Sequence, residues 1–151
     1  MYKVSKMVIA LIGESCTGKS SVSKELQNKL NAKIYSGKDY LRLSKSEEDS
    51  KLQFKKLLKD NEESPQNIIY IISEAEQTSF LPEKTIRILF TAPLETIKER
   101  FSKRMNGHLP EPVAKSLEKK HGMFDNIAYD LNVNGEMPLQ AVCDKILGFL
   151  N

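Results

Sequence analysis

The sequence predicts an α/β fold of three layers, in which a mostly parallel, five-stranded sheet is covered by helices on both faces. Segments with strand patterns alternate with segments of helical periodicity along the whole chain, which is typical of a parallel sheet with right-handed crossovers. The apolar run 7–12 leads through a glycine-rich turn directly into a helical pattern. The run 68–72 is short, rich in isoleucine and almost wholly apolar, as expected of a strand covered on both faces.

The first part of the chain predicts two strands and two helices. The first strand spans residues 7–12, and a helix with apolar residues at helical spacing follows over residues 19–30. Asn31 closes this helix, and residues 32–35 form a short second strand. A second helix begins after Ser46, which can cap it, and has acidic residues in its first turn. The apolar residues are Val22, Leu26 and Leu30 in the first helix and Phe54, Leu57 and Leu58 in the second.

The middle of the chain predicts a loop, two strands and a helix. Residues 60–67 form a polar loop before the apolar run already described, and residues 85–91 form the next strand. Pro93 opens a helix at its first turn, where its missing N–H costs nothing. This helix carries Arg100 and Arg104 one turn apart, so the two side chains can converge on one ligand. Its apolar stripe consists of Leu94, Ile97 and Phe101.

The last part of the chain predicts a break, two helices and a strand. Residues 105–112 contain Gly107 and two prolines, which end the preceding helix and form a short connection. A lysine-rich helix spans residues 113–123, a final strand spans 129–133, and an amphipathic helix over 139–150 closes the chain. The closing helix is expected to bury Val142, Ile146 and Phe149.

Length and composition favour a single folded domain. With 151 residues the chain has the size of a single domain with a real core, and we expect residues 1–151 to form one domain. The formal net charge of +3 comes from interleaved lysines and acids, which does not favour nucleic acid or a membrane surface as partner. The two cysteines form neither a disulfide framework nor a metal pattern, and the spacing of His108 and His121 is that of ordinary surface histidines. No apolar run approaches the roughly 20 residues of a membrane helix, and no signal-peptide pattern is present. We expect a cytoplasmic protein that is a monomer or a weak dimer.

Residues 13–20 read GESCTGKS and match the spacing G-x-x-x-x-G-K-[ST] of a phosphate-binding P-loop. The two glycines let the chain wrap, so that backbone N–H groups point inward at phosphate oxygens. Lys19 adds a positive charge for the outer phosphates, and Ser20 adds a hydroxyl ligand for Mg²⁺ at the positive end of the helix dipole. The alternative is a glycine-rich turn without a ligand, which the flanking strand and helix disfavour. The predicted nucleotide-binding residues of this loop are Gly13, Glu14, Ser15, Cys16, Thr17, Gly18, Lys19, Ser20 and Ser21.

Two variable positions of the P-loop carry chemically active side chains. Glu14 is expected to face solvent, because a carboxylate aimed at phosphates would repel the ligand. Cys16 is expected to be a small loop residue. A nucleophilic Cys16 is the alternative, since a helix N-terminus favours a thiolate, but no general base is identifiable near it.

In open parallel sheets, ligands bind beyond the carboxyl ends of the strands. This rule places the P-loop, the segment after Tyr35, residues 73–76 and the loop after Val133 along one edge of the sheet. The sequence therefore predicts one site that is built from four distant segments.

The other motifs favour a small kinase among the P-loop classes. The N-K-x-D and D-x-x-G segments of a GTPase are missing, and a motor or clamp ATPase would normally need a longer chain. The chain resembles the nucleoside-monophosphate kinases, including adenylate and cytidylate kinases, and more loosely the shikimate and gluconate kinases. Residues 36–42, SGKDYLR, look like the family's acceptor segment S-x-G-D-x-L-R with Lys38 inserted. The resemblance implies that Arg42 holds the acceptor's phosphate or acidic group and that Asp39 orients the acceptor or its Mg²⁺-bound water.

The same resemblance extends to the predicted helix with the two arginines. Residues 91–104 are similar to the helix that enters the lid of these kinases, which implies that Arg100 lies near the base of ATP and Arg104 reaches the transferring phosphoryl group. Residues 132–138 resemble the loop that receives the adenine ring, which would place Asn134 beside the nucleotide. A simple strand-to-helix turn is the alternative for that loop. The resemblance further implies an acceptor-binding segment of about 36–60 and a short lid of about 105–112.

One strand end departs from the family pattern. The third strand of these kinases ends in an aspartate followed by glycine, whereas this chain continues with Ser73, Glu74, Ala75 and Glu76. Glu74 is the candidate for the acid that holds Mg²⁺ together with Ser20 and contacts the substrate. A solvent-facing Glu74 is the alternative.

Together these observations predict a phosphotransferase that uses ATP and Mg²⁺ to move the γ-phosphoryl group to a small metabolite or a nucleoside monophosphate. Lys19, Arg100 and Arg104 would stabilise the developing charge, and Asp39 would orient the acceptor. Two alternatives stay open. One is a kinase of a non-nucleotide acceptor, such as shikimate, a sugar acid or an antibiotic. The other is a nucleotide-binding regulatory protein without turnover.

Overall fold

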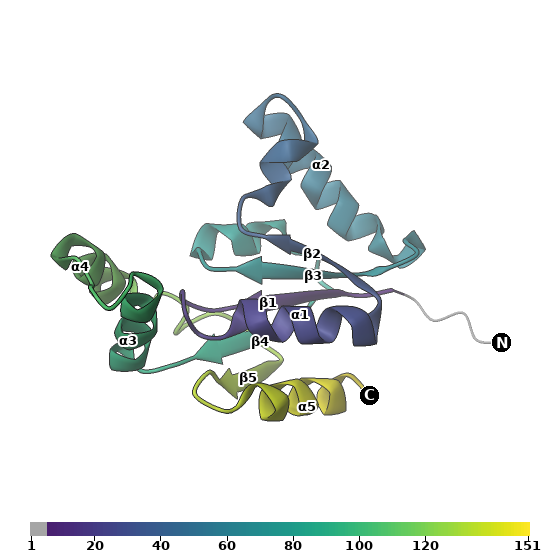
Figure 1. Cartoon of the computed structure of the whole chain (residues 1–151). Helices are drawn as coiled ribbons and strands as arrows, with labels where there is room; N and C mark the ends of the chain where they lie inside the picture. Colours follow the sequence, from purple (N-terminus) through teal and green to yellow (C-terminus); the bar gives the residue numbers. More distant parts are fainter. Residues whose placement is uncertain (1–5) are drawn as a thin grey trace.

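The computed structural model describes residues 6–151 and has one five-stranded sheet in which every pair of neighbouring strands is parallel. The strand order is β2-β3-β1-β4-β5, so β1 is central and pairs with β3 on one side and β4 on the other (Figure 1). The strands span Val8–Ile12 (β1), Ala32–Ser36 (β2), Asn67–Ile72 (β3), Ile86–Thr91 (β4) and Leu131–Asn134 (β5). The predicted α/β fold is therefore confirmed.

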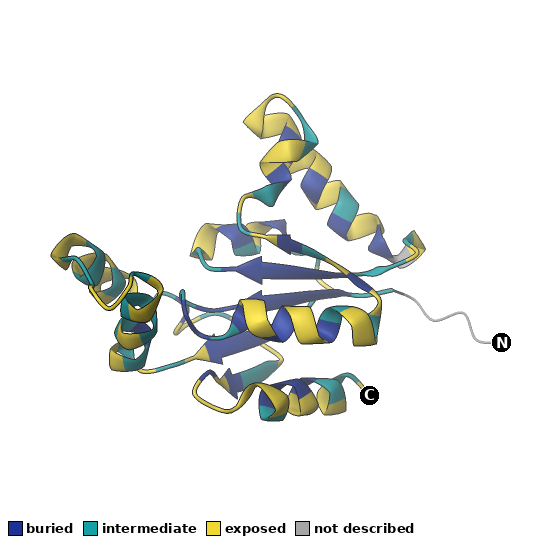
Figure 2. Cartoon of the chain, viewed as in Figure 1, coloured by how far each residue is buried: buried dark blue, intermediate teal, exposed yellow. Residues whose placement is uncertain are grey.

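Two apolar layers cover the two faces of the sheet, because side chains of a strand alternate between its faces. Ile9 and Leu11 face one layer, which is closed by the helices α1 (Lys19–Leu30) and α5 (Leu139–Leu150). Val8, Ala10 and Ile12 face the other layer, which contains residues of α2 (Glu47–Lys59) and of two short 3₁₀ helices, η1 (Asp39–Leu43) and η3 (Ala75–Phe80). Figure 2 shows the strands buried between these partly exposed helices.

An aromatic cluster on the α2 side fixes the segment that follows β2. Phe54 of α2 is completely buried and contacts the rings of Tyr35, Tyr70 and Phe80 with centroid distances of 4.9–5.5 Å. Tyr40 of η1 stacks on the same ring at 5.6 Å. The Tyr70 hydroxyl donates a hydrogen bond of 2.7 Å to the carbonyl of Gly37, which has a positive φ of 52°. The turn between β2 and η1 is therefore held at the carboxyl edge of the sheet.

The helices α3 (Leu94–Arg104) and α4 (Glu111–Lys120) pack against each other beyond the carboxyl ends of the strands (Figure 1). The sequence places the start of the fourth helix at residue 113, but the structure begins it at Glu111. Pro112 lies in the first turn of α4, where its ring is compatible with helical geometry, rather than in the preceding connection. The helix ends at Lys120 and not at residue 123, and Gly122 then adopts a positive φ of 85°.

Two further expectations need correction. Phe149 is 45% exposed, and Cys143 is buried in its place beside Val142 and Ile146, so the buried stripe of α5 runs toward Leu150, which packs on the core. Residues 75–80, for which the sequence predicts no helix, form η3 because Glu74 and Gln77 cap it reciprocally. Within residues 6–151, none of the helices combines the length and apolar character that a bilayer crossing requires.

Candidate phosphate-binding site

The loop from Gly13 to Gly18 connects the central strand to α1 and wraps as a phosphate-binding loop requires. A Cβ atom on Gly13 would lie 2.6 Å from the carbonyl oxygen of Phe90, so only glycine fits against β4. Gly18 occupies the N-cap position of α1 with φ 97°. Because glycine has no side chain to cap the helix, the first N–H groups of α1 remain available to an anion. Cys16 also has a positive φ, 64°, although it is not glycine. Alternation of right- and left-handed backbone conformations is typical of the concave turns whose successive N–H groups bind one anion.

Lys19 is buried under this loop and binds its backbone. The ammonium group donates hydrogen bonds to the carbonyl oxygens of Gly13 and, at 2.7 Å, Glu14. The residue is only 4% exposed, and this burial lowers the pKa of Lys19 to about 7, although the nearby Glu14 carboxylate favours the charged form. The Lys19 amine therefore lies next to the place where phosphate oxygens would bind, and the negative charge of a bound phosphate would favour its protonated form.

A small hollow of about 110 Å³ lies at the mouth of the P-loop, and we call it the phosphate hollow. Arg104 of α3 reaches over it, and its exposed guanidinium has no hydrogen-bond or ion-pair partner within the described part of the chain. Ser36 at the end of β2 and Ser73 after β3 close the opposite wall. The hollow is lined by Ser15, Cys16, Gly18, Lys19, Ser20, Ser21, Ser36, Ile71, Ser73 and Arg104.

A second hollow of about 330 Å³ adjoins the first between α3 and the start of α5. Its volume lies at the lower end of the range for small-molecule pockets. Thr17, Phe90 and Val142 form part of its wall, and Gly18, Ser21 and Arg104 line both hollows. A ligand with a compact apolar ring and a phosphate chain could therefore span the two.

Arg100 bridges the P-loop and the loop after β5, which both line this second hollow. Its guanidinium donates to the carbonyl oxygen of Cys16 at 2.9 Å and to that of Gly135 at 2.7 Å. The loop after β5 also approaches the P-loop directly, because a Cβ atom on Gly135 would lie 2.5 Å from the Thr17 carbonyl oxygen. Arg100 thus lines the hollow with both of its outer nitrogens engaged by backbone.

We expect Arg100→Ala to raise the nucleotide KM about tenfold and to lower the melting temperature by several degrees. The two lost hydrogen bonds from a charged donor are each worth about 1.5–3 kcal/mol when partly buried, and they position the P-loop against the β5–α5 loop. Titration with a nucleotide and thermal unfolding would measure both effects. A large loss of kcat with an unchanged melting temperature would instead mean that Arg100 touches the transferring group.

Asn134 and Cys16 have local roles in this structure. The Asn134 side chain is not part of the wall of the second hollow, and its oxygen accepts a hydrogen bond of 2.8 Å from the backbone N–H of Glu136, which closes the turn after β5. Burial raises the pKa of the Cys16 thiol even though Arg104, Lys19 and Arg100 favour the thiolate. This environment favours a structural Cys16 over a nucleophilic one.

The predicted acceptor segment lies beside the phosphate hollow. The Asp39 carboxylate accepts a hydrogen bond of 2.9 Å from the backbone N–H of Ser36, which shapes the turn after β2. Arg42 of η1 is exposed and has no hydrogen-bond or ion-pair partner among residues 6–151. The segment therefore presents one oriented carboxylate and one uncommitted guanidinium.

The structure places two acidic residues differently from the sequence expectation. Glu14 does not face solvent freely, because its carboxylate accepts from Nδ1 of His121 at 2.9 Å and from the backbone N–H of Gly122 at 3.1 Å. Glu74 forms an ion pair of 3.0 Å with Lys120 and caps η3, and it does not line the phosphate hollow. Both carboxylates thus hold the end of α4 against the carboxyl edge of the sheet.

A magnesium ion would find few protein ligands here. Ser20, in the first turn of α1, is exposed and lines the phosphate hollow. No group of three or more histidine, cysteine, aspartate or glutamate side chains in the described residues could hold a metal ion. These residues suit Mg²⁺ that takes most of its oxygen ligands from phosphates and water, as is usual for this ion.

Sequence reasoning missed two serines and one histidine of this region. The strand-end rule does place the segments of Ser36 and Ser73 at this edge, where β2 and β3 both end, but neither serine is among the predicted site residues, and both line the phosphate hollow. The contact of His121 with Glu14 joins residues 107 positions apart, and no spacing in the sequence indicates it.

Comparisons with known proteins support the fold. No family model matches the chain, and no curated protein matches it in sequence. A sugar kinase from Janibacter sp. HTCC2649 is 14% identical, with a TM-score of 0.68 over 96% of this chain and 94% of that one. Shikimate kinase from Acinetobacter baumannii, in complex with shikimate, is 15% identical, with a TM-score of 0.66 over 96% and 93%. Deoxyadenosine kinase from M. mycoides, with bound dATP, is 20% identical, with a TM-score of 0.60 over 96% and 100%. The chain therefore has the fold of P-loop small-molecule kinases, as its sequence resemblance predicts.

Proposed function

We propose that the protein is an ATP-dependent phosphotransferase that moves the γ-phosphoryl group to a hydroxyl group of a small acceptor. The observation that carries this proposal is that the P-loop, buried Lys19 and Arg104, which has no hydrogen-bond or ion-pair partner among the described residues, line one small hollow. A nucleotide side and an acceptor side open from that hollow. Catalysis of phosphoryl transfer needs little more than such positioning and charge neutralisation.

In this proposal the chain's own groups position the reactants. The base of ATP lies in the second hollow and its phosphates lie on the N–H groups of the P-loop, while Lys19 exchanges its two carbonyl partners for phosphate oxygens. Asp39 orients the acceptor hydroxyl, and Arg104 neutralises charge on the phosphoryl group as its bond to the bridging oxygen breaks and the new P–O bond forms. Ser20 would hold Mg²⁺, which when bound neutralises charge on the outer phosphates.

A non-nucleotide acceptor fits the acceptor side better than a nucleoside monophosphate. The phosphate hollow is small and Ser36 and Ser73 are part of its lining, while Arg42 is exposed on η1, the short helix that follows β2. Such a lining suits a compact molecule with several hydroxyl groups and one acidic group, and two of the similar structures are a sugar kinase and a shikimate kinase. We therefore favour a hydroxylated acid as the acceptor.

The test is a coupled assay of ADP release with ATP and Mg²⁺ against a panel of acceptors. The panel contains sugar acids, polyols, cyclic hydroxy acids and nucleoside monophosphates. Turnover stimulated by a hydroxylated acid supports the proposal, and turnover stimulated only by a monophosphate overturns the acceptor class. Failure of ATP to stabilise the protein in thermal unfolding would overturn the whole proposal.

One observation supports a second candidate, a nucleotide-binding regulator without turnover. Glu74, the acid expected near Mg²⁺, is engaged by Lys120 and by the start of η3. ATP binding without release of ADP in the presence of any acceptor would favour this candidate.

Arg42→Gln is expected to raise the acceptor KM about 10- to 100-fold and to leave the nucleotide KM unchanged. The substitution removes the exposed guanidinium that would pair with the acceptor's acidic group, and such a charged hydrogen bond is worth about 1.5–3 kcal/mol. Lys45→Gln, which removes an exposed cation three residues further on, serves as the matched control in the same steady-state assay. Equal effects of the two variants would contradict the role of Arg42.

A further inference from the structure

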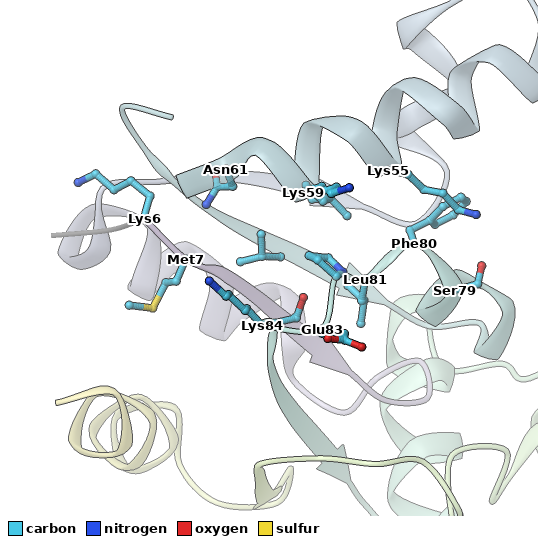
Figure 3. A pocket seen from close by; sticks show the side chains of 14 residues that line it. Lys6, Met7, Lys55, Lys59, Asn61, Ser79, Phe80, Leu81, Glu83 and Lys84 are labelled. Atoms are coloured by element: carbon cyan, nitrogen blue, oxygen red, sulfur yellow. The ribbon is translucent and has the colours of Figure 1, made fainter. Parts of the chain in front are cut away.

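A larger hollow lies at the opposite end of the sheet from the P-loop. Its volume is about 760 Å³, and it opens between α2, the start of β1 and the chain before β4 (Figure 3). The five residues of β1 separate it from the P-loop by a strand of about 15 Å. Its floor is apolar and includes Val8, Leu58 and Phe80, each at least nine-tenths buried. We call it the amino-end hollow.

Two buried polar side chains of this hollow have no hydrogen-bond partner within the part of the chain that the structure describes. Asn61, which follows α2, is 2% exposed, and neither its amide nitrogen nor its amide oxygen has a hydrogen-bond partner in the structure. Thr85, directly before β4, is 4% exposed, and its hydroxyl has no partner either. Figure 3 shows the Asn61 amide at the end of α2, directed toward the strand that carries Met7. An unpaired buried amide or hydroxyl lowers the stability of the folded protein by about 1–3 kcal/mol. Three such atoms in one hollow therefore indicate a binding partner outside the chain.

The rim of the amino-end hollow is cationic. Lys55 and Lys59 extend from exposed positions of α2, and Lys6 approaches from the chain before β1 (Figure 3). None of these three ammonium groups has a hydrogen-bond or ion-pair partner among residues 6–151, and Glu83 is the acidic residue of the same lining. An anionic ligand would therefore be attracted to this hollow, and its apolar part could pack on the floor.

We propose that the amino-end hollow is a second ligand site, which binds a small amphipathic carboxylate. The apolar part of the ligand packs on Leu58 and Phe80, and the carboxylate accepts hydrogen bonds from the Asn61 amide and the Thr85 hydroxyl. The lysines of the rim balance its charge. The volume lies within the range of 300–1,000 Å³ that is usual for small-molecule pockets. This site is independent of the phosphoryl transfer proposed for the P-loop edge.

The test uses 4-phenylbutanoate and its neutral partner 4-phenylbutanamide, which have the same apolar body. Each is titrated into ¹⁵N-labelled protein of full length while amide chemical shifts are followed. We expect 4-phenylbutanoate to shift the amides near Met7, Leu58 and Leu81 and not those of residues 13–20. The neutral amide should bind at least tenfold more weakly, because it lacks the charge that the rim attracts.

Substitutions separate a ligand site from a packing defect. Asn61→Leu and Thr85→Val keep the number of heavy atoms and the branching of the side chain and remove the unpaired groups, so each should weaken binding of 4-phenylbutanoate about tenfold or more. The same variants should unfold at an unchanged temperature or about 2–5 °C higher, because a buried polar group without partners is removed. A double change of Lys55 and Lys59 to glutamine should also weaken binding. Lys56→Gln, on the same helix but outside the lining, is the control.

Three results would overturn the proposal. The first is the absence of shifts around the hollow at 10 mM 4-phenylbutanoate, about the weakest affinity that a specific site of this size would have. The second is equal binding of the carboxylate by the wild type and by the Asn61 and Thr85 variants. The third is concentration-dependent self-association in analytical ultracentrifugation that a bulky Ser79→Trp substitution in the hollow abolishes, because the occupant would then be a second copy of the chain.

Discussion

Lys19→Met is expected to lower kcat for phosphoryl transfer about 10²- to 10³-fold and to abolish measurable stabilisation by ATP. The Lys19 amine is buried in the P-loop beside the phosphate hollow, and a single preorganised group aimed at developing charge is worth this much in phosphoryl and acyl transfer sites. Isothermal titration with an ATP analogue and the coupled assay of ADP release would measure the two losses. Methionine keeps the length and the apolar stem of the side chain, so the loop can stay closed.

The same substitution should make the free protein more stable near neutral pH. The pKa of Lys19 is lowered to about 7 by burial, while an unfolded lysine has about 10.4, so between these values the unfolded chain binds more protons than the folded one. The free energy of unfolding of the wild type therefore rises as the pH increases from 7 toward 10, by an upper bound of about 4 kcal/mol. Lys19→Met removes this dependence, and urea unfolding at pH 7, 8.5 and 10 would detect its loss.

Lys24→Met is the matched control for both measurements. Lys24 lies on the exposed face of α1, so its removal should change neither nucleotide binding nor the dependence of stability on pH. If Lys19→Met retained ATP binding, Lys19 would not contact phosphate. If its stability followed pH in parallel with the wild type, the buried ammonium would not be the titrating group.

The elements that the sequence predicts well are those with a local cause. The helix α1 has the predicted bounds because Gly18 and Asn31 supply the left-handed conformations at its two ends. Ser46 caps α2 as predicted, with its hydroxyl accepting from the backbone N–H of Asp49 at 3.0 Å. The central strand, β1, is predictable because its residues are apolar on both faces of the sheet. These signals lie within a few residues of the feature that they specify.

The features that the sequence does not predict depend on contacts between segments that are far apart along the chain. Arg100 was expected to reach a nucleotide, but its position against the carbonyl groups of Cys16 and Gly135 depends on where α3 leaves β4. Glu74 lies in the predicted strand-end region, yet Lys120 binds it from a helix whose packing no pattern reveals. The amino-end hollow could not be predicted for the same reason. Asn61 lies in a polar stretch of the sequence, and only the folded structure shows that it is buried.

Arg104→Lys is expected to lower kcat about 10²-fold, and Arg104→Ala about 10³-fold, while the nucleotide KM changes less than about threefold. Arg104 is exposed, lines both hollows and has no hydrogen-bond or ion-pair partner in residues 6–151, so it is free to follow the phosphoryl group during transfer. A guanidinium can fork onto two equatorial oxygens, and an ammonium group keeps the charge without that geometry. The retained charge explains why lysine should be the milder change, and groups of this kind contribute about 10³- to 10⁵-fold to phosphoryl transfer.

The kinetic pattern distinguishes this role from simple electrostatic attraction of ATP. Lys98→Gln removes a cation from the same helix, but its ammonium pairs with Glu118 and lines neither hollow, so its kcat should match the wild type. An interaction made only in the transition state lowers kcat and kcat/KM together, whereas loss of uniform binding raises KM alone. If Arg104→Ala raised the nucleotide KM and left kcat intact, Arg104 would bind the ground state, and the charge on the transferring group would have to be neutralised by Lys19 and the bound metal alone.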